Sequence, residues 1–222
     1  MKQLGMITIG QAPRTDVAPL IEKYLEGRAE LVQSGVLDGL TAKQIAELAP
    51  EPGDYVLTSR LKDGSAAVVA REKIRPLLDG KIRELETLGI RTILLLCTGS
   101  FPGLHANRSH LIEPDRIIPP AVQALADGRR LGLIGPLPEQ AGQLDLKFST
   151  LVQPAFAAAS PYTSGEAEFR QAVETLKGRV ELILLDCMGY DERHREWVSK
   201  AAAGIPVILS NALMGKLVSE TV

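Results

Sequence analysis

Two cysteines occupy matching positions in the sequence. Cys97 follows the apolar run 93–96, Cys187 follows the run 182–185 with one aspartate between, and a glycine stands two residues after each cysteine. A thiol at the end of a buried strand lies beside backbone N–H groups, which bind anions and lower a thiol pKa. Two thiols on opposite sides of one carbon could remove the proton next to a carboxylate and return one on the other face. Their ordinary pKa of about 8.5 suits such proton transfer, so we expect Cys97 and Cys187 to be catalytic.

The cysteine pair leaves other interpretations open. Two buried thiols can serve only as small core residues. A disulfide is a further alternative, although thiols are normally reduced in the cytosol. The sequence has neither a CxxC motif nor a cluster of cysteine and histidine. We therefore expect no metal site, and the proton transfer described above needs no cofactor.

The segments around the cysteines belong to an internal repeat. Residues 93–99 match residues 183–189 with an offset of 187 − 97 = 90, and residues 4–7 match residues 131–134 with an offset of 131 − 4 = 127. The first copy is therefore longer by 127 − 90 = 37 residues between the matched segments. We expect the extra length at about 54–69, where Asp-Gly between two short β-type runs predicts a hairpin.

Short apolar runs alternate with amphipathic segments, which is typical of an α/β protein with buried parallel sheets. The hairpin strands are expected at 54–58 and 66–69. The other expected strands are 4–9, 30–36, 92–96, 131–134, 151–156, 182–185 and 207–209. The expected helices are 16–26, 41–48, 74–88, 119–126, 166–176, 192–202 and 212–220, with Thr41 and Ser164 as N-caps.

The repeat predicts two pseudo-symmetric three-layer α/β/α domains with a cleft between them. The first domain would comprise residues 1–115 plus 211–222, including the inserted hairpin, and the second domain residues 116–210. We place the join within 111–120, where the prolines are expected to break regular structure. The final helix would then return to the first domain.

Charge and hydropathy exclude several classes of function. The 222 residues carry 25 basic and 27 acidic side chains, a formal charge of 25 − 27 = −2, so no strong attraction to nucleic acid is expected. The longest strongly apolar run, 93–97, is too short to cross a bilayer, and the N-terminal residues lack a signal-peptide pattern. We expect a cytoplasmic protein with neither nucleic-acid nor membrane partners, and a homo-oligomer stays open.

Ligands of open parallel sheets bind at the carboxyl ends of the strands, so the residues there are substrate-binding candidates. Arg14 among them favours a small anionic, carboxylate-containing ligand, with a solvated role as the alternative. Ser210 and Asn211 could also act only as an N-cap. The candidates are Thr8, Gln11, Arg14, Thr98, Gly99, Ser100, Met188, Gly189, Ser210 and Asn211.

Two further residues near these loops are expected to have structural roles. Asp186 precedes Cys187 and points to the other side of its strand, so we expect it to pair with a neighbouring cation. His194 lies on a helix among Glu192, Arg193 and Arg195, which predicts a solvated or ion-paired face.

The chain resembles the AroM family of the Asp/Glu/hydantoin racemase superfamily over nearly its full length. The resemblance rests on Ile7-Thr8-Ile9-Gly10 with Pro13, Arg108 through Glu113-Pro114, Arg116-Ile117-Ile118-Pro119-Pro120, Leu185-Asp186-Cys187-Met188-Gly189, Arg193-His194-Arg195 and Pro206-Val207-Ile208-Leu209-Ser210-Asn211.

The resemblance implies two pseudo-symmetric α/β domains, an active site between them and cofactor-independent isomerase or racemase chemistry next to a carboxylate. Cys97 and Cys187 match the two catalytic cysteines of the superfamily, and Thr98 and Gly99 match its carboxylate-binding residues. Racemases of this group that act on amino acids usually have an acid after the first strand and a Thr-His pair after the second cysteine. Gln11 to Arg14 and Met188-Gly189 stand there in this chain, which argues against an amino-acid substrate.

Two alternatives to an isomerase remain at this point. Some branches of the superfamily decarboxylate malonate-like acids with a single cysteine. The chain could also be a non-catalytic regulatory protein that binds a small acid in the same cleft.

Overall fold

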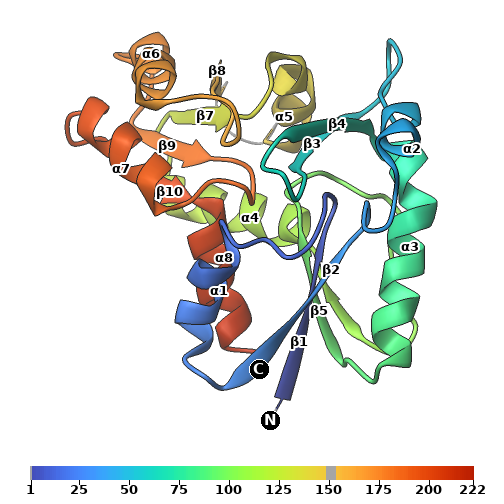
Figure 1. Ribbon diagram of the computed structural model, residues 1–222. Coiled ribbons are helices and arrows are strands. Elements are labelled where there is room, and N and C mark those ends of the chain that lie inside the picture. Colours follow the sequence, from blue (N-terminus) through green and yellow to red (C-terminus); the bar gives the residue numbers. More distant parts are fainter. Residues whose placement is uncertain (1, 149–153) are drawn as a thin grey trace.

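Two four-stranded parallel sheets form the framework of the protein (Figure 1). The computed structural model describes residues 2–148 and 154–222. The strand order is β2-β1-β5-β6 in the first sheet and β10-β9-β7-β8 in the second. The first sheet comprises β1 (Lys2–Thr8), β2 (Ala29–Gly35), β5 (Thr92–Leu96) and β6 (His110–Ile112). The second comprises β7 (Leu131–Gly135), β8 (Ala155–Ala158), β9 (Leu182–Leu185) and β10 (Val207–Leu209).

Helices cover both sheets, which confirms the predicted α/β class (Figure 1). The C-terminal helix α8 packs against α1, near the start of the chain. The helices are α1 (Ala18–Leu25), α2 (Ala42–Glu47), α3 (Arg71–Thr87), α4 (Pro114–Ala126), the 3-10 turn η1 (Pro138–Gln140), α5 (Ala141–Lys147), α6 (Glu166–Leu176), α7 (Glu192–Ala201) and α8 (Ser210–Ser219). Within the described residues, no helix has both the length and the apolar character to cross a membrane.

The internal repeat is present in the strand pairing. Leu4 of β1 pairs with Thr92 of β5, and Leu131 of β7 pairs with Leu182 of β9. Adding the two sequence offsets to the first pair gives 4 + 127 = 131 and 92 + 90 = 182, which is the second pair. The order β2-β1-β5-β6 is likewise the order β8-β7-β9-β10 of the other sheet. The two halves therefore share strand order and register, as the repeat predicts.

The extra length of the first half includes the predicted hairpin. Strands β3 (Val56–Arg60) and β4 (Ala66–Ala70) pair antiparallel in a sheet of their own. They lie beside α5 of the second half (Figure 1). Gln140 of η1 donates from Nε2 to the carbonyl oxygen of Val56 at 3.1 Å. The hairpin of one half is thus joined directly to a helical segment of the other.

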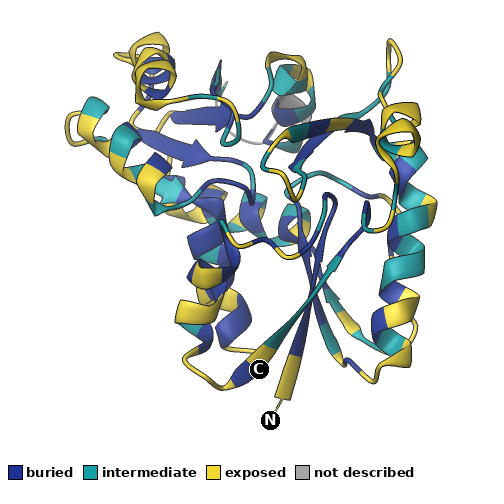
Figure 2. Cartoon of the chain, viewed as in Figure 1, coloured by how far each residue is buried: buried dark blue, intermediate teal, exposed yellow. Residues whose placement is uncertain are grey.

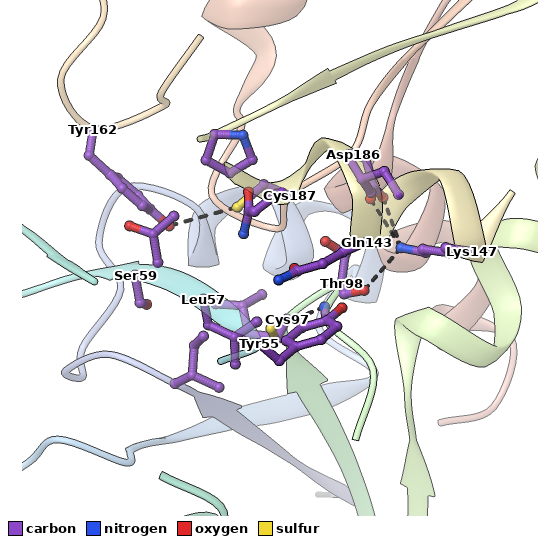
Figure 3. Close-up of a pocket in the computed structure, with 17 residues that line it drawn as sticks. Tyr55, Leu57, Ser59, Cys97, Thr98, Gln143, Lys147, Tyr162, Asp186 and Cys187 are labelled. Atoms are coloured by element: carbon purple, nitrogen blue, oxygen red, sulfur yellow. Dashed lines mark hydrogen bonds and ion pairs between the residues drawn. The ribbon is translucent and has the colours of Figure 1, made fainter. Parts of the chain in front are cut away.

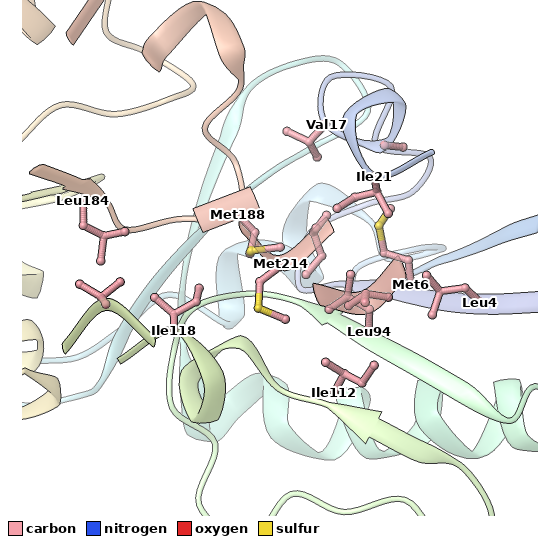
Figure 4. Close-up of a cluster of buried hydrophobic side chains, with 14 of the residues drawn as sticks. Leu4, Met6, Val17, Ile21, Leu94, Ile112, Ile118, Leu184, Met188 and Met214 are labelled. Atoms are coloured by element: carbon pink, nitrogen blue, oxygen red, sulfur yellow. The ribbon is translucent and has the colours of Figure 1, made fainter. Parts of the chain in front are cut away.

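A shared hydrophobic core joins the two halves. Strand residues alternate between the faces of each sheet, so Leu4 and Leu94 of the first sheet face the same cluster as Leu131 and Leu184 of the second. Met214 of α8 lies in this central cluster, 0 % exposed (Figure 4). Figure 2 shows buried residues running through both sheets and the helices between them.

Several elements differ from the sequence-based expectation. Helix α4 begins at Pro114 rather than at residue 119, so Pro119 and Pro120 lie inside the helix and do not break it. Pro114 fits the first turn of a helix, and burial of Ile118 and Val122 in the central core offsets the lost hydrogen bonds. The predicted break of regular structure is present at Glu113, between β6 and α4, but the break expected at Pro119 and Pro120 is wrong, because α4 runs through both.

Smaller differences concern element ends. The expected strand 151–156 is observed as β8 from Ala155, and its residues 151–153 lie outside the described residues. Thr41 caps α2 as predicted, with Gln44 completing the capping box. Ser164 does not cap α6, because its Oγ accepts the N–H of Ser160 and Gly165 is the N-cap residue.

Of the two expected environments of His194, the solvated one is wrong, because the side chain is buried; the acidic partner is present, since Nδ1 lies 2.6 Å from the Asp191 carboxylate. The backbone N–H of His194 donates to the Asp191 carboxylate at 3.1 Å, which caps α7. Its ring is buried against Phe169, Tyr190 and Trp197. Packing against these aromatic rings places the His194 side chain in the interior, although the residues next to it in the sequence are charged.

Candidate functional site

Residues from the two halves enclose one cavity at the carboxyl ends of the strands. The first sheet contributes the segment after β5, the second the segments after β7 and β9, and the hairpin and the η1–α5 segment close the sides (Figures 1 and 3). The lining residues are Ile9, Tyr55, Leu57, Thr58, Ser59, Leu96, Cys97, Thr98, Gly99, Pro136, Gln140, Gln143, Leu144, Lys147, Tyr162, Asp186 and Cys187.

Both cysteines line this cavity, on opposite sides of it (Figure 3). Both thiols are free. The Sγ of Cys97 accepts the N–H of Gly99 at 3.3 Å, and the Sγ of Cys187 accepts the N–H of Gly189 at the same distance. The two thiols therefore have equivalent local geometry, as expected of matched strand ends.

Burial changes the acidity of the thiols in the opposite direction from the sequence-based expectation. Burial raises the pKa of Cys97 to about 12, although the Gly99 N–H and the charge of Lys147 oppose the change. Burial also raises the pKa of Cys187, against the Gly189 N–H, Arg14 and the Tyr162 hydroxyl. In this structure both groups are neutral S–H at pH 7, and the N–H groups reduce the effect of burial without reversing it.

Each thiol faces a buried cation from the other half. Arg14, in the loop between β1 and α1, lowers the pKa of Cys187, and Lys147, at the end of α5, lowers that of Cys97. The Arg14 guanidinium is paired with Asp16 at 2.8 and 2.9 Å. Lys147 is paired with Asp186 at 3.1 Å, which confirms the predicted cation partner of Asp186. The Nζ of Lys147 also donates to the carbonyl oxygen of Thr98 at 2.9 Å, next to Cys97.

Two tyrosine hydroxyls complete the polar lining. The Tyr162 hydroxyl lies 4.0 Å from the Sγ of Cys187 and accepts a hydrogen bond from Arg14 at 3.5 Å. The Tyr55 hydroxyl accepts the N–H of Ser100 at 3.2 Å. Burial raises the pKa of Tyr162 and raises that of Tyr55 to about 12, so both remain protonated. Because each already accepts a hydrogen bond, its own O–H proton is left to donate.

The structure brings part of the predicted set together. Thr98 and Gly99 line the cavity with the two cysteines. The other candidates do not line it: Thr8, Gln11, Arg14, Ser100, Met188, Gly189, Ser210 and Asn211.

Several of these candidates hold the surroundings of the cavity in place. Thr8 accepts from Arg14 at 3.1 Å, and its hydroxyl lies 3.4 Å from that of Ser59, which does line the cavity. Gln11 ties its loop to the hairpin by accepting the N–H of Lys62 at 2.9 Å. Gly189 touches Tyr162, since a Cβ at this position would overlap the tyrosine hydroxyl.

The remaining candidates are buried elsewhere. Met188 belongs to the central core and is 1 % exposed. Ser210 and Asn211 are fully buried in the first turn of α8, and Leu209 is the N-cap residue. Their side-chain oxygen and nitrogen atoms have no hydrogen-bond partner among the described residues. The alternative that these two residues act as an N-cap is therefore wrong.

Besides Asp186, which was expected to have only a structural role, sequence reasoning missed seven polar residues of the lining. None of the seven follows a strand of the two main sheets directly, and the hairpin region and the η1–α5 segment carry six of them, so the strand-end rule could not find them. The missed residues are Tyr55, Thr58, Ser59, Gln140, Gln143, Lys147 and Tyr162.

The cavity lining combines neutral hydrogen-bond donors with the ion-paired cation Lys147. Among residues 2–148 and 154–222, no group of three histidine, cysteine, aspartate or glutamate side chains has the arrangement of a metal site.

Comparison with a family of known sequences identifies the chain. Residues 4–222 match the AroM protein family. The chain belongs to the AroM family. No curated protein matches it significantly.

Solved structures show where the AroM fold belongs. The chain superposes on glutamate racemase from Thermus thermophilus with a TM-score of 0.60 at 16 % identity, over 99 % of this chain and 80 % of that one. It superposes on the maleate isomerase Iso from Pseudomonas putida S16 with a TM-score of 0.64 at 12 % identity, over 99 % of this chain and 92 % of the isomerase chain. For arylmalonate decarboxylase the TM-score is 0.61 at 16 % identity, over 100 % of this chain and 92 % of the decarboxylase chain. The AroM chain therefore has the two-domain fold of these enzymes.

Proposed function

We propose that this protein is a cofactor-independent isomerase or racemase that acts on the carbon next to a carboxylate. The observation that carries the proposal is that two thiols from equivalent strand ends line opposite sides of one cavity. Two acid–base groups placed on opposite sides are what inversion of a carbon centre requires. The racemases and the maleate isomerase among the structural neighbours support the same class of reaction.

The proposed step moves one proton on each side of the carbon. One cysteine first releases its S–H proton to solvent. The resulting thiolate takes the proton from the α-carbon, and the C–H electron pair moves into the carboxylate to give an enediolate. The other cysteine, as thiol, gives its proton to the opposite face of the carbon, and the electron pair returns to form the new C–H bond. The two cysteines exchange protonation states in each turnover, so the reverse reaction restores the first state.

Cys187 is the better candidate for the thiolate when a proton leaves. Arg14, the Gly189 N–H and the Tyr162 hydroxyl all favour its charged form. The O–H groups of Thr98, Tyr55 and Tyr162 would hold the carboxylate of a small acid as its charge grows. Gly99 has no side chain, so its backbone beside Cys97 could come close to the bound acid.

A second candidate is decarboxylation of a malonate-like acid. The raised pKa of both thiols favours it, because this reaction needs a neutral S–H as proton donor. The C–C bond to one carboxylate would break, CO₂ would leave with the electron pair remaining as an enediolate, and one thiol would protonate the carbon. Solvent would then return a proton to the thiolate. The similarity to arylmalonate decarboxylase supports this alternative.

Deuterium uptake from D₂O tests the isomerase proposal directly. A panel of 2-substituted carboxylic acids is incubated with the wild type, Cys97→Ser and Cys187→Ser, and the deuterium at C2 and the released CO₂ are measured. We expect C2 exchange in the wild type and its loss in both variants. CO₂ release abolished by only one substitution would indicate the decarboxylase.

A third result would indicate a binding protein. Ligand-dependent thermal stabilisation without exchange and without CO₂ would contradict both enzymatic candidates. Equal melting temperatures of the unliganded wild type and variants would show that the fold is intact.

A further inference from the structure

A second, larger cavity adjoins the thiol cavity. The thiol cavity measures about 40 Å³, whereas the neighbouring one measures about 540 Å³. Three residues, Tyr55, Gln143 and Lys147, line both. The smaller space holds about three water molecules, so it has no room for an acid with a long substituent. The larger space falls within the range of about 300–1,000 Å³ that is typical of ligand sites.

The wall of the second cavity has a definite chemistry. The Arg71 guanidinium stacks on the Tyr55 ring, 4.4 Å from its centroid, and donates to the carbonyl oxygen of Ser100 at 3.2 Å. The carboxylate of Asp115 lies on the same wall, 3.9 Å from the Nζ of Lys147. Lys147 itself is already paired with Asp186. Arg71 is also paired with Glu72, at 2.7 Å from its Nε and 2.6 Å from its Nη2. Together with the bond to Ser100 this leaves two of the five guanidinium N–H groups as donors. The wall therefore presents the remaining guanidinium donors and one carboxylate acceptor.

We propose that this second cavity binds the substituent of the substrate, and that the substituent ends in a neutral polar group with both acceptors and donors, such as a primary amide. This inference rests on the proposed function of the thiol cavity, where the carboxylate and the reacting carbon would lie. Arg71 would donate to the carbonyl of the amide, and Asp115 would accept from its NH₂ group. The shared wall of Tyr55, Gln143 and Lys147 would lie along the chain that connects the two ends.

Gly142 gives a way to fill this cavity with little disturbance of the protein. It lines the second cavity but not the first, and a Cβ added to it meets no atom within 4 Å. It lies in α5, where replacement of glycine favours the helix. Gly80 of α3 is a matched control, because a Cβ there also meets nothing within 4 Å and the residue lines neither cavity.

The experiment measures by calorimetry the affinity of three probes for the wild type, Gly142→Leu, Gly80→Leu and Arg71→Gln. The probes are methylmalonate, (2-carbamoylethyl)malonate and the apolar isostere (3-methylbutyl)malonate. We expect the wild type and Gly80→Leu to bind the carbamoyl acid best. In Gly142→Leu the preference for the carbamoyl acid over methylmalonate should fall by about tenfold or more. In Arg71→Gln the preference for the carbamoyl acid over its isostere should be lost.

Three results would overturn the proposal: equal affinity of the wild type for all three acids, no binding of any of them, or an unchanged preference in Gly142→Leu. Deuterium exchange at C2, followed on the same samples, separates this proposal from the proposed function. Selective binding without exchange would contradict the isomerase and leave the substituent site supported. Deuterium exchange at C2 together with an unchanged ligand preference in Gly142→Leu would support the isomerase and contradict the substituent site.

Discussion

Cys97 and Cys187 have environments made of the same parts. Each accepts the N–H of the glycine two residues later and lies near a buried cation from the other half, while Cys97 is buried and Cys187 is half-buried. Burial outweighs the other two effects and keeps both thiols protonated. A thiolate would therefore form mainly during the reaction, when substrate is bound and a proton is transferred.

The raised pKa of Cys97 predicts a loss of stability in alkali. Below about pH 8.5 the folded and unfolded chains both hold this proton, and above that pH the unfolded chain releases it first. The free energy of unfolding should therefore fall as pH rises from about 9 toward the folded pKa of about 12. Urea unfolding at pH 8, 9 and 10 should show a smaller pH dependence in Cys97→Ser, and identical pH dependence in the two proteins would contradict the assignment.

Gly189 should be sensitive to a single methyl group. A Cβ at this position would overlap the Tyr162 hydroxyl, so Gly189→Ala should move that hydroxyl away from Cys187. We expect C2 exchange to fall by about tenfold to a hundredfold, because a misplaced catalytic group costs rate at this scale. Gly80→Ala, which meets nothing within 4 Å, should exchange like the wild type. Similar rates in both variants would mean that Tyr162 does not act at the site.

At the scale of elements, the β3–β4 hairpin and α5 close the site together. Gln140 bonds to the backbone of β3, and Lys147 spans from α5 to Thr98 after β5 and to Asp186 after β9. The buried Lys147–Asp186 pair is therefore a junction between strand ends of the two halves. Removing one partner would leave the other charge buried without compensation.

Lys147→Met should accordingly destabilise the protein by about 3–5 kcal/mol. The double variant Lys147→Met/Asp186→Asn should recover much of this loss, because it removes the unpaired charge as well. Urea unfolding at pH 7 measures both. Lys177→Met, which breaks an exposed pair with Glu174, is the control and should cost about 1 kcal/mol or less. A similar small cost for Lys147→Met would show that the junction contributes little.

Some of the strands and helices could be predicted from the sequence and others could not. Strands β1, β5, β7 and β9 were predictable because each is a continuous apolar run buried on both faces. The three-residue β6 and the seven-residue α5 were not, since they have neither the uninterrupted apolar run of β10 nor the capping box of α2. Lys147 was missed with α5, and Tyr162 because it lies in a loop beyond an edge strand.

In the whole molecule, the repeat was predictable because two pairs of short sequence segments match in the same order. The strand register of the two sheets has the same two offsets. The sequence also placed both cysteines at a cavity that residues of both halves line. It could not show that Met188, Ser210 and Asn211 are buried away from that cavity, because strand-end position does not determine the direction of a side chain. The division into residues 1–115 plus 211–222 and residues 116–210 stays a prediction.

The shared core predicts cooperative unfolding of both halves. Met214 of α8 contacts a cluster formed by both sheets and is 0 % exposed. Met214→Ala should cost about 2–5 kcal/mol. Because the cluster belongs to both halves, urea unfolding followed by far-ultraviolet circular dichroism and by Trp197 fluorescence should give coincident transitions. Two separated transitions would show that the halves unfold independently.

Cys97 and Cys187 line one small cavity, which we propose binds a carboxylate. Alkylation of the native protein by iodoacetate, compared with iodoacetamide and mapped by mass spectrometry, is the decisive experiment, because iodoacetate carries its reactive carbon next to a carboxylate. Iodoacetate should react faster than iodoacetamide, and one label on either cysteine should fill the cavity of about 40 Å³ and block the other. Faster reaction with iodoacetamide, or native chains labelled on both cysteines, would contradict this proposal.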